Sequence, residues 1–178
     1  MLIENDPTRL SPALHAIWLE VCARVLRERG WHLFLTQTHR DQEAQALAFS
    51  QGKSRARWGE SWHNLEPALA LDFAVVSDFT KIPTRRWSMP GAFDWDERKL
   101  AFVGRVAEQC GLVWGGRFTG VRDLPHLQGP AAAAPGESWH ALSPSGREAR
   151  VAEEIASRHS QVFELHPRKN FSNRFPSP

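Results

Sequence analysis

Two histidines and two aspartates of this 178-residue sequence are spaced so that they could form one metal site. His63 comes shortly before residues 68–76 (ALALDFAVV), a stretch that is typical of a buried β-strand and contains Asp72. Alternation along the strand puts Asp72 on a face of small alanines, and a carboxylate buried there needs a cation, hydrogen-bond donors or a metal. Because a nearby arginine or backbone N–H groups would also satisfy it, Asp72 by itself does not predict a metal.

The second half of the candidate site lies in the segment Asp-Leu-Pro-His at residues 123–126. Pro125 favours an extended conformation at the residue before it, and so Asp123 and His126 are held on one short, stiff segment. Glycines at positions 115 and 116 come shortly before, and they permit an unusual backbone path or a close approach of the backbone to a ligand. The alternative for Asp123 is an aspartate that opens a turn.

Brought together, His63, Asp72 and His126 would supply three nitrogen and oxygen ligands with a fourth position open, as is typical of a catalytic zinc site. Asp123 would then be the carboxylate that does not bind zinc and takes a proton from water. His63 could equally be a surface histidine, since two ligands alone are a weak signal.

Composition leaves imidazole and carboxylate as the main groups for this chemistry. The chain has 8 His and 20 Asp+Glu but no Tyr and only 2 Cys, which excludes a tyrosine nucleophile, a disulfide framework and a cysteine-only metal site. The net charge of +2 comes from interspersed charges, so we expect no nucleic-acid partner. No apolar run is long enough to span a membrane, and the N-terminus lacks the pattern of a secretory signal. We therefore expect synthesis in the cytoplasm.

The elements that must position these residues mix helices and strands without a regular βαβ alternation, which favours an α+β fold. Amphipathic patterns and capping residues predict helices over about residues 12–29, 41–49 and 96–110. Strands are expected at residues 31–36, 68–76 and 112–114, and an irregular segment is expected at 77–95. We expect a catalytic domain over residues 1–128. An extension over 129–178 would follow, with a linker, a helix at 145–158 and a loose tail, and would pack on that domain.

Three sequence blocks occur in a fixed order: R-x-x-x-x-Q…Q-G-K over residues 40–53, S-x-H…A-x-D over 61–72, and W-G-G…D-x-P-H over 114–126. Together they resemble the zinc D-Ala-D-Ala carboxypeptidase and L-alanyl-D-glutamate endopeptidase family (VanY-like) of cell-wall peptidases, and in particular its phage endolysin branch. The resemblance covers about residues 30–128. It implies a small, mainly antiparallel sheet with flanking helices, the single-domain fold of the zinc DD-peptidases, which is Hedgehog-like.

The resemblance also implies a role for each matching residue. The family's zinc ligands correspond to His63, Asp72 and His126. Its catalytic acid/base corresponds to Asp123, and the arginine that positions or polarises the substrate corresponds to Arg40. Ser61 matches a serine that lines the substrate site, and Gln45 matches a structural residue.

The function that this resemblance implies is zinc-dependent hydrolysis of peptidoglycan stem peptides by an L-alanyl-D-glutamate endopeptidase acting as a phage or prophage endolysin. The alternatives are a D-Ala-D-Ala carboxypeptidase or dipeptidase of the same family, and a non-catalytic wall-binding or structural module. We expect Zn²⁺ as the cofactor, the stem peptide as the substrate and a monomeric protein. A lysis enzyme without a signal sequence implies holin-type delivery to the cell wall.

Overall fold

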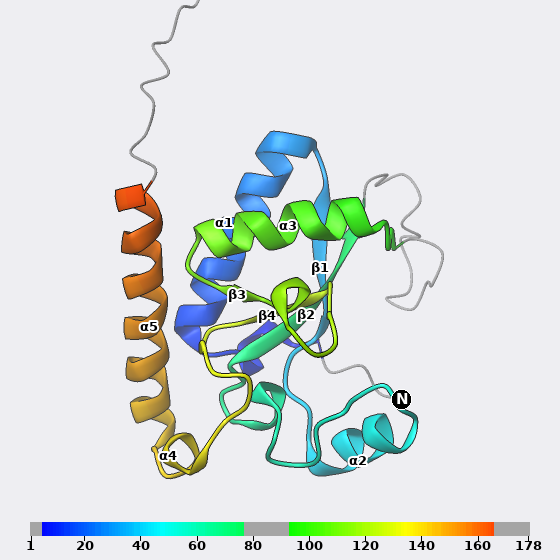
Figure 1. Cartoon of the computed structure of the whole chain (residues 1–178), viewed down its shortest axis with the longest axis vertical. Coiled ribbons are helices and arrows are strands. Elements are labelled where there is room, and N and C mark those ends of the chain that lie inside the picture. Colours follow the sequence, from blue (N-terminus) through cyan, green and yellow to red (C-terminus); the bar gives the residue numbers. More distant parts are fainter. Residues whose placement is uncertain (1–4, 77–92, 166–178) are drawn as a thin grey trace, which may run out of the picture.

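Four short strands form an antiparallel sheet at the centre of the part of the chain that the structure describes (Figure 1). The computed structural model describes residues 5–76 and 93–165. The strands are β1 (His32–Gln37), β2 (Ala70–Val76), β3 (Val113–Trp114) and β4 (His126–Gln128), in the order β1-β2-β4-β3. Together with the helices around it, this sheet confirms the predicted α+β fold.

Three helices begin where their capping residues predict. They are α1 (Pro12–Arg29), α2 (Gln42–Ser50) and α3 (Glu97–Gln109). The side chains that precede them accept a hydrogen bond from a first-turn backbone N–H group, and these side chains are Ser11, Asp41 and Asp96. α1 ends at Gly30, whose φ of 68° lies in the left-handed region that glycine adopts without strain.

β2 is an interior strand, paired with β1 on one side and with β4 on the other. All of its residues except Asp72 are buried, which explains why the sequence reads as one apolar run. The ring of Phe73 lies 6.0 Å from that of Trp18 in α1, so this face of β2 belongs to the hydrophobic core. The side chain of Asp72 points to the opposite face, as the alternation predicts.

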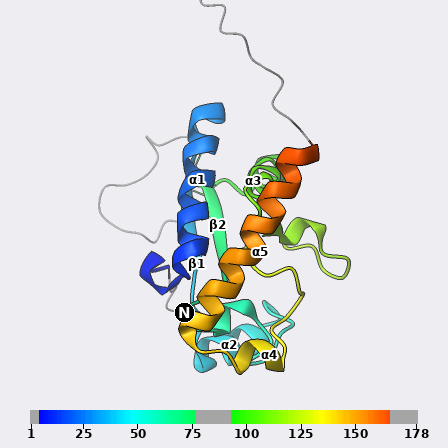
Figure 2. The ribbon, with the colours of Figure 1, turned by 90° about the vertical axis from the view of Figure 1, so that its left-hand side faces the viewer.

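The C-terminal part contains a short helix, α4 (Glu137–His140), and a long one, α5 (Pro144–Leu165). α5 runs along the same side of the molecule as α1 and α3, as two views show (Figures 1 and 2). It continues to Leu165 instead of ending near residue 158 as predicted. Its Val151 and Ile155, together with Trp139 of α4, are part of the same hydrophobic core as the sheet. The domain boundary at residue 128 stays a prediction.

Two predicted features fall largely outside the described residues. These are the irregular segment at 77–95, of which only residues 93–95 are described, and the loose tail beyond residue 165. Among the described helices, none is both long and apolar enough to cross a membrane.

Candidate metal centre

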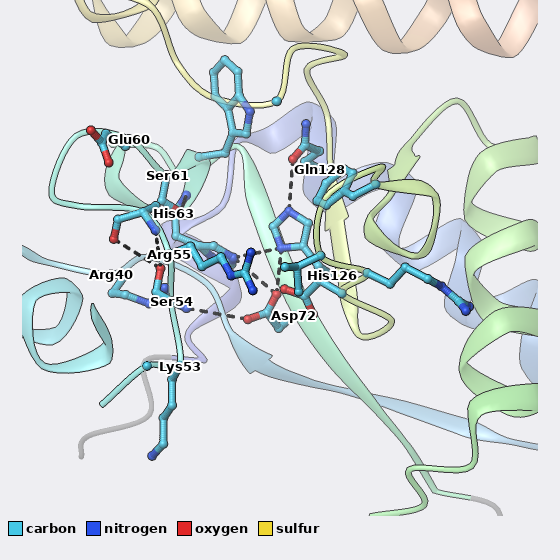
Figure 3. Close-up of a pocket in the computed structure, with 18 residues that line it drawn as sticks. Arg40, Lys53, Ser54, Arg55, Glu60, Ser61, His63, Asp72, His126 and Gln128 are labelled. Carbon is cyan, nitrogen blue, oxygen red and sulfur yellow. Dashed lines mark hydrogen bonds and ion pairs between the residues drawn. The ribbon is translucent and has the colours of Figure 1, made fainter. Parts of the chain in front are cut away.

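The three predicted metal ligands meet at one point (Figure 3). The Oδ1 atom of Asp72 lies 3.0 Å from Nδ1 of His126 and 3.3 Å from Nε2 of His63. The same two ring nitrogens are 3.3 Å apart. Both histidine rings are buried, whereas the side chain of Asp72 keeps 20% of its surface exposed. One nitrogen from each ring and a carboxylate oxygen therefore converge at the lining of a pocket.

Strand register and a capped turn bring the ligands together. In the antiparallel pair of β2 and β4, Asp72 lies directly opposite His126. His63 belongs to a 3₁₀ turn, η2 (Trp62–Asn64), whose position is fixed by a capping box. In that box the hydroxyl of Ser61 accepts from the His63 N–H, and the Asn64 side chain accepts from the Ser61 N–H.

The outer nitrogen of each histidine ring faces an oxygen atom. Nδ1 of His63 lies 2.6 Å from the Thr38 carbonyl oxygen, and Nε2 of His126 lies 3.1 Å from Oε1 of Gln128. A carbonyl oxygen can only accept, so each outer nitrogen carries the proton and each neutral ring turns a lone pair toward Asp72. Three acceptor atoms in mutual contact need a cation among them, which is either a proton or a metal ion. This donor set fits zinc, which binds imidazole nitrogens and carboxylate oxygens in proteins. The ligating histidines of such sites usually donate a hydrogen bond from the other ring nitrogen, as both rings do here.

The pKa values of Asp72 and His126 reflect the attraction between the carboxylate and a cation at this site. Burial alone would raise the pKa of Asp72. When a proton is the cation among the three groups, the charge of a protonated His63 and the hydrogen bond from a protonated His126 outweigh burial and hold the pKa of Asp72 well below its usual value. Burial lowers the pKa of His126, and the hydrogen bond to Asp72 and its negative charge more than compensate, so the net shift of that pKa is upward. The site therefore favours a carboxylate with a positive charge beside it.

All six predicted site residues line a single pocket of about 550 Å³. They are Arg40, Ser61, His63, Asp72, Asp123 and His126. One wall is formed by residues 52–56 and 60–62 and the other by residues 118 and 121–123, with the three candidate ligands between them. Desolvation by the pocket walls and the charge of Asp72 raise the pKa of Asp123, although the residue as a whole remains exposed. A carboxyl group of raised pKa thus stands near the candidate metal position.

Arg40 is held at the pocket by a network centred on a fully buried glutamine, Gln45 of α2. The Arg40 guanidinium lies 3.8 Å from Oδ2 of Asp72 and donates to Oε1 of Gln45 at 3.3 Å. That oxygen also accepts from the Asn64 side chain, while Nε2 of Gln45 donates to the Ala56 carbonyl. Gln45 therefore joins Arg40, the η2 turn and the pocket wall, which supports the structural role predicted for it.

The two glycines after β3 allow the segment at 123–126 to lie against a 3₁₀ turn, η4 (Gly115–Arg117). A Cβ atom on Gly115 would lie 2.4 Å from the Asp123 carbonyl oxygen, and one on Gly116 would lie 2.2 Å from the Trp114 ring. The indole N–H of Trp114 donates to the Leu124 carbonyl at 2.8 Å. The close approach predicted at these glycines is therefore an approach of the chain to itself.

The sequence did not reveal the groups that accept hydrogen bonds from the outer nitrogens of the two histidines. Gln128 lies two residues after His126 in β4, and the period of a strand alone could have placed it on the same face. Thr38 contributes only its backbone carbonyl, which leaves no signal in the sequence. Arg55 and Arg122, which also line the pocket, were not identified either, and Lys53, the last residue of the first sequence block, was assigned no role.

Comparisons with known proteins relate the chain to a family, a curated relative and a solved structure. Residues 54–129 match the family described as D-alanyl-D-alanine carboxypeptidase. A curated relative, the peptidoglycan L-alanyl-D-glutamate endopeptidase CwlK of Bacillus subtilis (strain 168), is 31% identical over 113 residues, which span 56% of this chain and 62% of CwlK. Among solved structures, the L-Ala D-Glu endopeptidase ChiX of Serratia marcescens matches with a TM-score of 0.49 and 19% identity. That match covers 71% of this chain and 84% of ChiX.

The matched region contains Ser61, the three candidate ligands and Asp123. The resemblance drawn from the three sequence blocks is confirmed, because residues 54–129, the part of the chain that forms the site, match the D-alanyl-D-alanine carboxypeptidase family.

Proposed function

We propose that this protein is a zinc-dependent peptidase that hydrolyses the bond between L-Ala and D-Glu in peptidoglycan stem peptides. The observation that carries the proposal is the convergence of His63, Asp72 and His126 in a pocket that also contains Asp123. The choice of bond follows the named activity of CwlK, to which the chain is similar over 62% of that relative's length.

The three candidate ligands would hold zinc through Nε2 of His63, Nδ1 of His126 and a carboxylate oxygen of Asp72. A zinc ion held there would lower the pKa of a water molecule from about 15.7 toward about 7. The protein itself keeps the rings in the protonation state that a metal requires, because Thr38 and Gln128 occupy their outer N–H groups.

Asp123 and Arg40 would act on the reacting peptide. Asp123 would accept a proton from the attacking water and deliver it to the leaving amine, a role worth about 10²–10⁴-fold in rate. Its raised pKa suits a group that must both accept and release a proton. Arg40 would donate hydrogen bonds to the peptide oxygen on which negative charge develops. Ser61, also in the pocket lining, would contact the substrate.

The charge of the pocket walls fits an acidic peptide. Lys53 and Arg55 lie on one wall and have no hydrogen-bond or ion-pair partner for their side chains within the described ranges 5–76 and 93–165. Arg122 lies on the other wall, and within the described ranges its side chain donates one hydrogen bond, to the Gly116 carbonyl. A stem peptide carries free carboxylates, including that of D-Glu, and these cations would attract them.

Digestion of purified peptidoglycan in the presence of zinc tests the proposal. Mass spectrometry should find fragments with a newly freed D-Glu amino group, and H63A should produce none. Release of D-Ala instead would show that the protein is a D-Ala-D-Ala carboxypeptidase of the same family. Intact peptidoglycan with zinc bound would support a non-catalytic wall-binding module and contradict the proposal.

We also propose that the enzyme acts as a monomer and as a phage or prophage endolysin delivered by a holin-type pore. Expression in a bacterial host with and without a holin tests this role. Lysis should require both proteins, and a culture that stays intact with both present would contradict it.

A further inference from the structure

A buried glutamine outside the predicted site contacts the second histidine. Gln128 is 1% exposed and lies in β4, two residues after His126. Its Oε1 atom is 3.1 Å from Nε2 of His126. Its Nε2 atom donates to two backbone carbonyls, those of Pro130 at 2.7 Å and Ala132 at 2.8 Å. The amide group therefore uses its oxygen on the histidine and its nitrogen on the chain that follows.

These two carbonyls fix the orientation of the amide. If the amide were flipped, its oxygen would face two carbonyl oxygens, and both amide protons would lose their acceptors. The Gln128 oxygen must therefore face His126, and the ring must donate from Nε2. In the neutral ring this leaves a lone pair on Nδ1, which is the atom 3.0 Å from Asp72.

The turn that supplies the two carbonyls is itself held by the C-terminal part of the chain. The Ala132 carbonyl also accepts from the indole N–H of Trp62, whose ring packs edge-on against Trp139 of α4 at 5.1 Å. From α5, Glu154 accepts the backbone N–H of Ala131, and Arg158 donates to the Gly129 carbonyl. The contacts thus run from α5 through the turn at 129–132 to Gln128 and the histidine ring.

We propose that Gln128 is a positioning residue that sets the tautomer and orientation of His126 for metal binding, and that the turn at 129–132 holds Gln128 in place. The inference rests on the proposed zinc site. The extension after residue 128 then has a second role besides covering the core, because its carbonyl groups orient Gln128, which in turn orients the candidate ligand His126.

The Gln128→Met variant tests this role, because it keeps the length of the side chain and removes both sets of hydrogen bonds. We expect its zinc affinity, measured by competition with a chromophoric chelator, to fall about 10–100-fold. We expect the visible absorption of the Co²⁺-loaded protein, which reports the ligand geometry, to change as well. Gln128→Glu keeps an acceptor for the ring N–H but loses both N–H donors to the turn, so we expect its zinc affinity to fall less than that of Gln128→Met.

Val25→Ala is the matched control for loss of stability alone. Val25 is a fully buried residue of α1, which takes no part in the contacts described for the turn at 129–132, and its truncation removes core contacts only. We expect this variant to melt at a lower temperature with unchanged zinc affinity and cobalt spectrum. If Gln128→Met fails to fold, Gln128→Glu compared with Val25→Ala decides the question.

The inference is overturned if Gln128→Met binds zinc as tightly as the parent with the same cobalt spectrum. It is also overturned if Gln128→Glu loses as much affinity as Gln128→Met, because the acceptor on the ring would then be irrelevant. Failure of the proposed function gives a different result, in which the parent protein itself binds no zinc.

Discussion

Replacement of Gly115 by alanine tests whether the η4 turn positions the catalytic segment. A Cβ atom at this position would lie 2.4 Å from the Asp123 carbonyl oxygen and 3.0 Å from Cβ of His126, while ordinary contacts begin near 3.4 Å. The obstructing oxygen is backbone and cannot rotate away. The Asp123 N–H also donates to the Gly115 carbonyl. This hydrogen bond resists the separation of the η4 turn from the segment at 123–126 that the added methyl group would require. The segment at 123–126 must therefore shift by about 1 Å.

Such a shift should affect both stability and catalysis. Overpacking of this kind costs about 1–3 kcal/mol, and each kcal/mol lowers the Tm of a domain of this size by about 2–4 °C. A displacement of about 1 Å in a catalytic group can cost about 10²-fold in rate. Because the shift moves both Asp123 and His126, we expect G115A to lose zinc affinity as well as peptidoglycan-hydrolysing activity.

The assays are thermal denaturation, zinc titration and release of soluble fragments from dye-labelled peptidoglycan. G120A is the matched control, because Gly120 lies in the same loop and a Cβ atom there would have nothing within 4 Å. G120A should match the parent in all three assays. If G115A behaves like G120A, the argument that the glycine positions the site is refuted.

Three further predictions concern the pocket. D123N should keep its zinc but hydrolyse peptidoglycan about 10²–10⁴-fold more slowly, because the amide cannot accept a proton; equal turnover in the parent and D123N would show that another group is the base. R55E should raise KM for stem peptides with little change in kcat, since Arg55 lines the pocket, whereas R57E, at an exposed position stacked on Phe49 outside that lining, should change neither. Equal effects of the two charge reversals on KM would contradict a specific role for Arg55. Removal of zinc with a chelator should lower Tm, and zinc at about 100 times its Kd should restore about 2.7 kcal/mol of stability; a melting curve indifferent to zinc would contradict the site.

The elements with strong local signals could be predicted from the sequence. The first three helices follow from their caps and apolar spacing, and the interior strand β2 follows from its apolar run. β4 was not predicted, because three residues are too few to show a period. It is nevertheless the strand whose register places His126 opposite Asp72. The fold class was therefore predictable, while the pairing that builds the site was not.

The candidate ligands could be named because their residue types and order resemble a known pattern, and the structure brings their atoms together. The contacts behind them depend on tertiary structure. The carbonyl of Thr38 reaches His63 across 25 positions of the sequence, and a backbone group carries no mark of its partner. The same is true of the two carbonyls that orient Gln128. The sequence pattern therefore named the candidate ligands, and the fold showed which groups accept hydrogen bonds from their outer nitrogens.

Zinc content and peptidoglycan cleavage, measured together on the parent protein and on H63A, test the central claim most directly. The parent should bind one zinc ion per chain, because residues 5–76 and 93–165 contain one group of this kind, His63–Asp72–His126, and it should free the amino group of D-Glu. H63A, which loses one of the three ligands, should lose both the metal and the cleavage. Cleavage by H63A at the parent's rate, or by parent protein stripped of metal, would contradict the account.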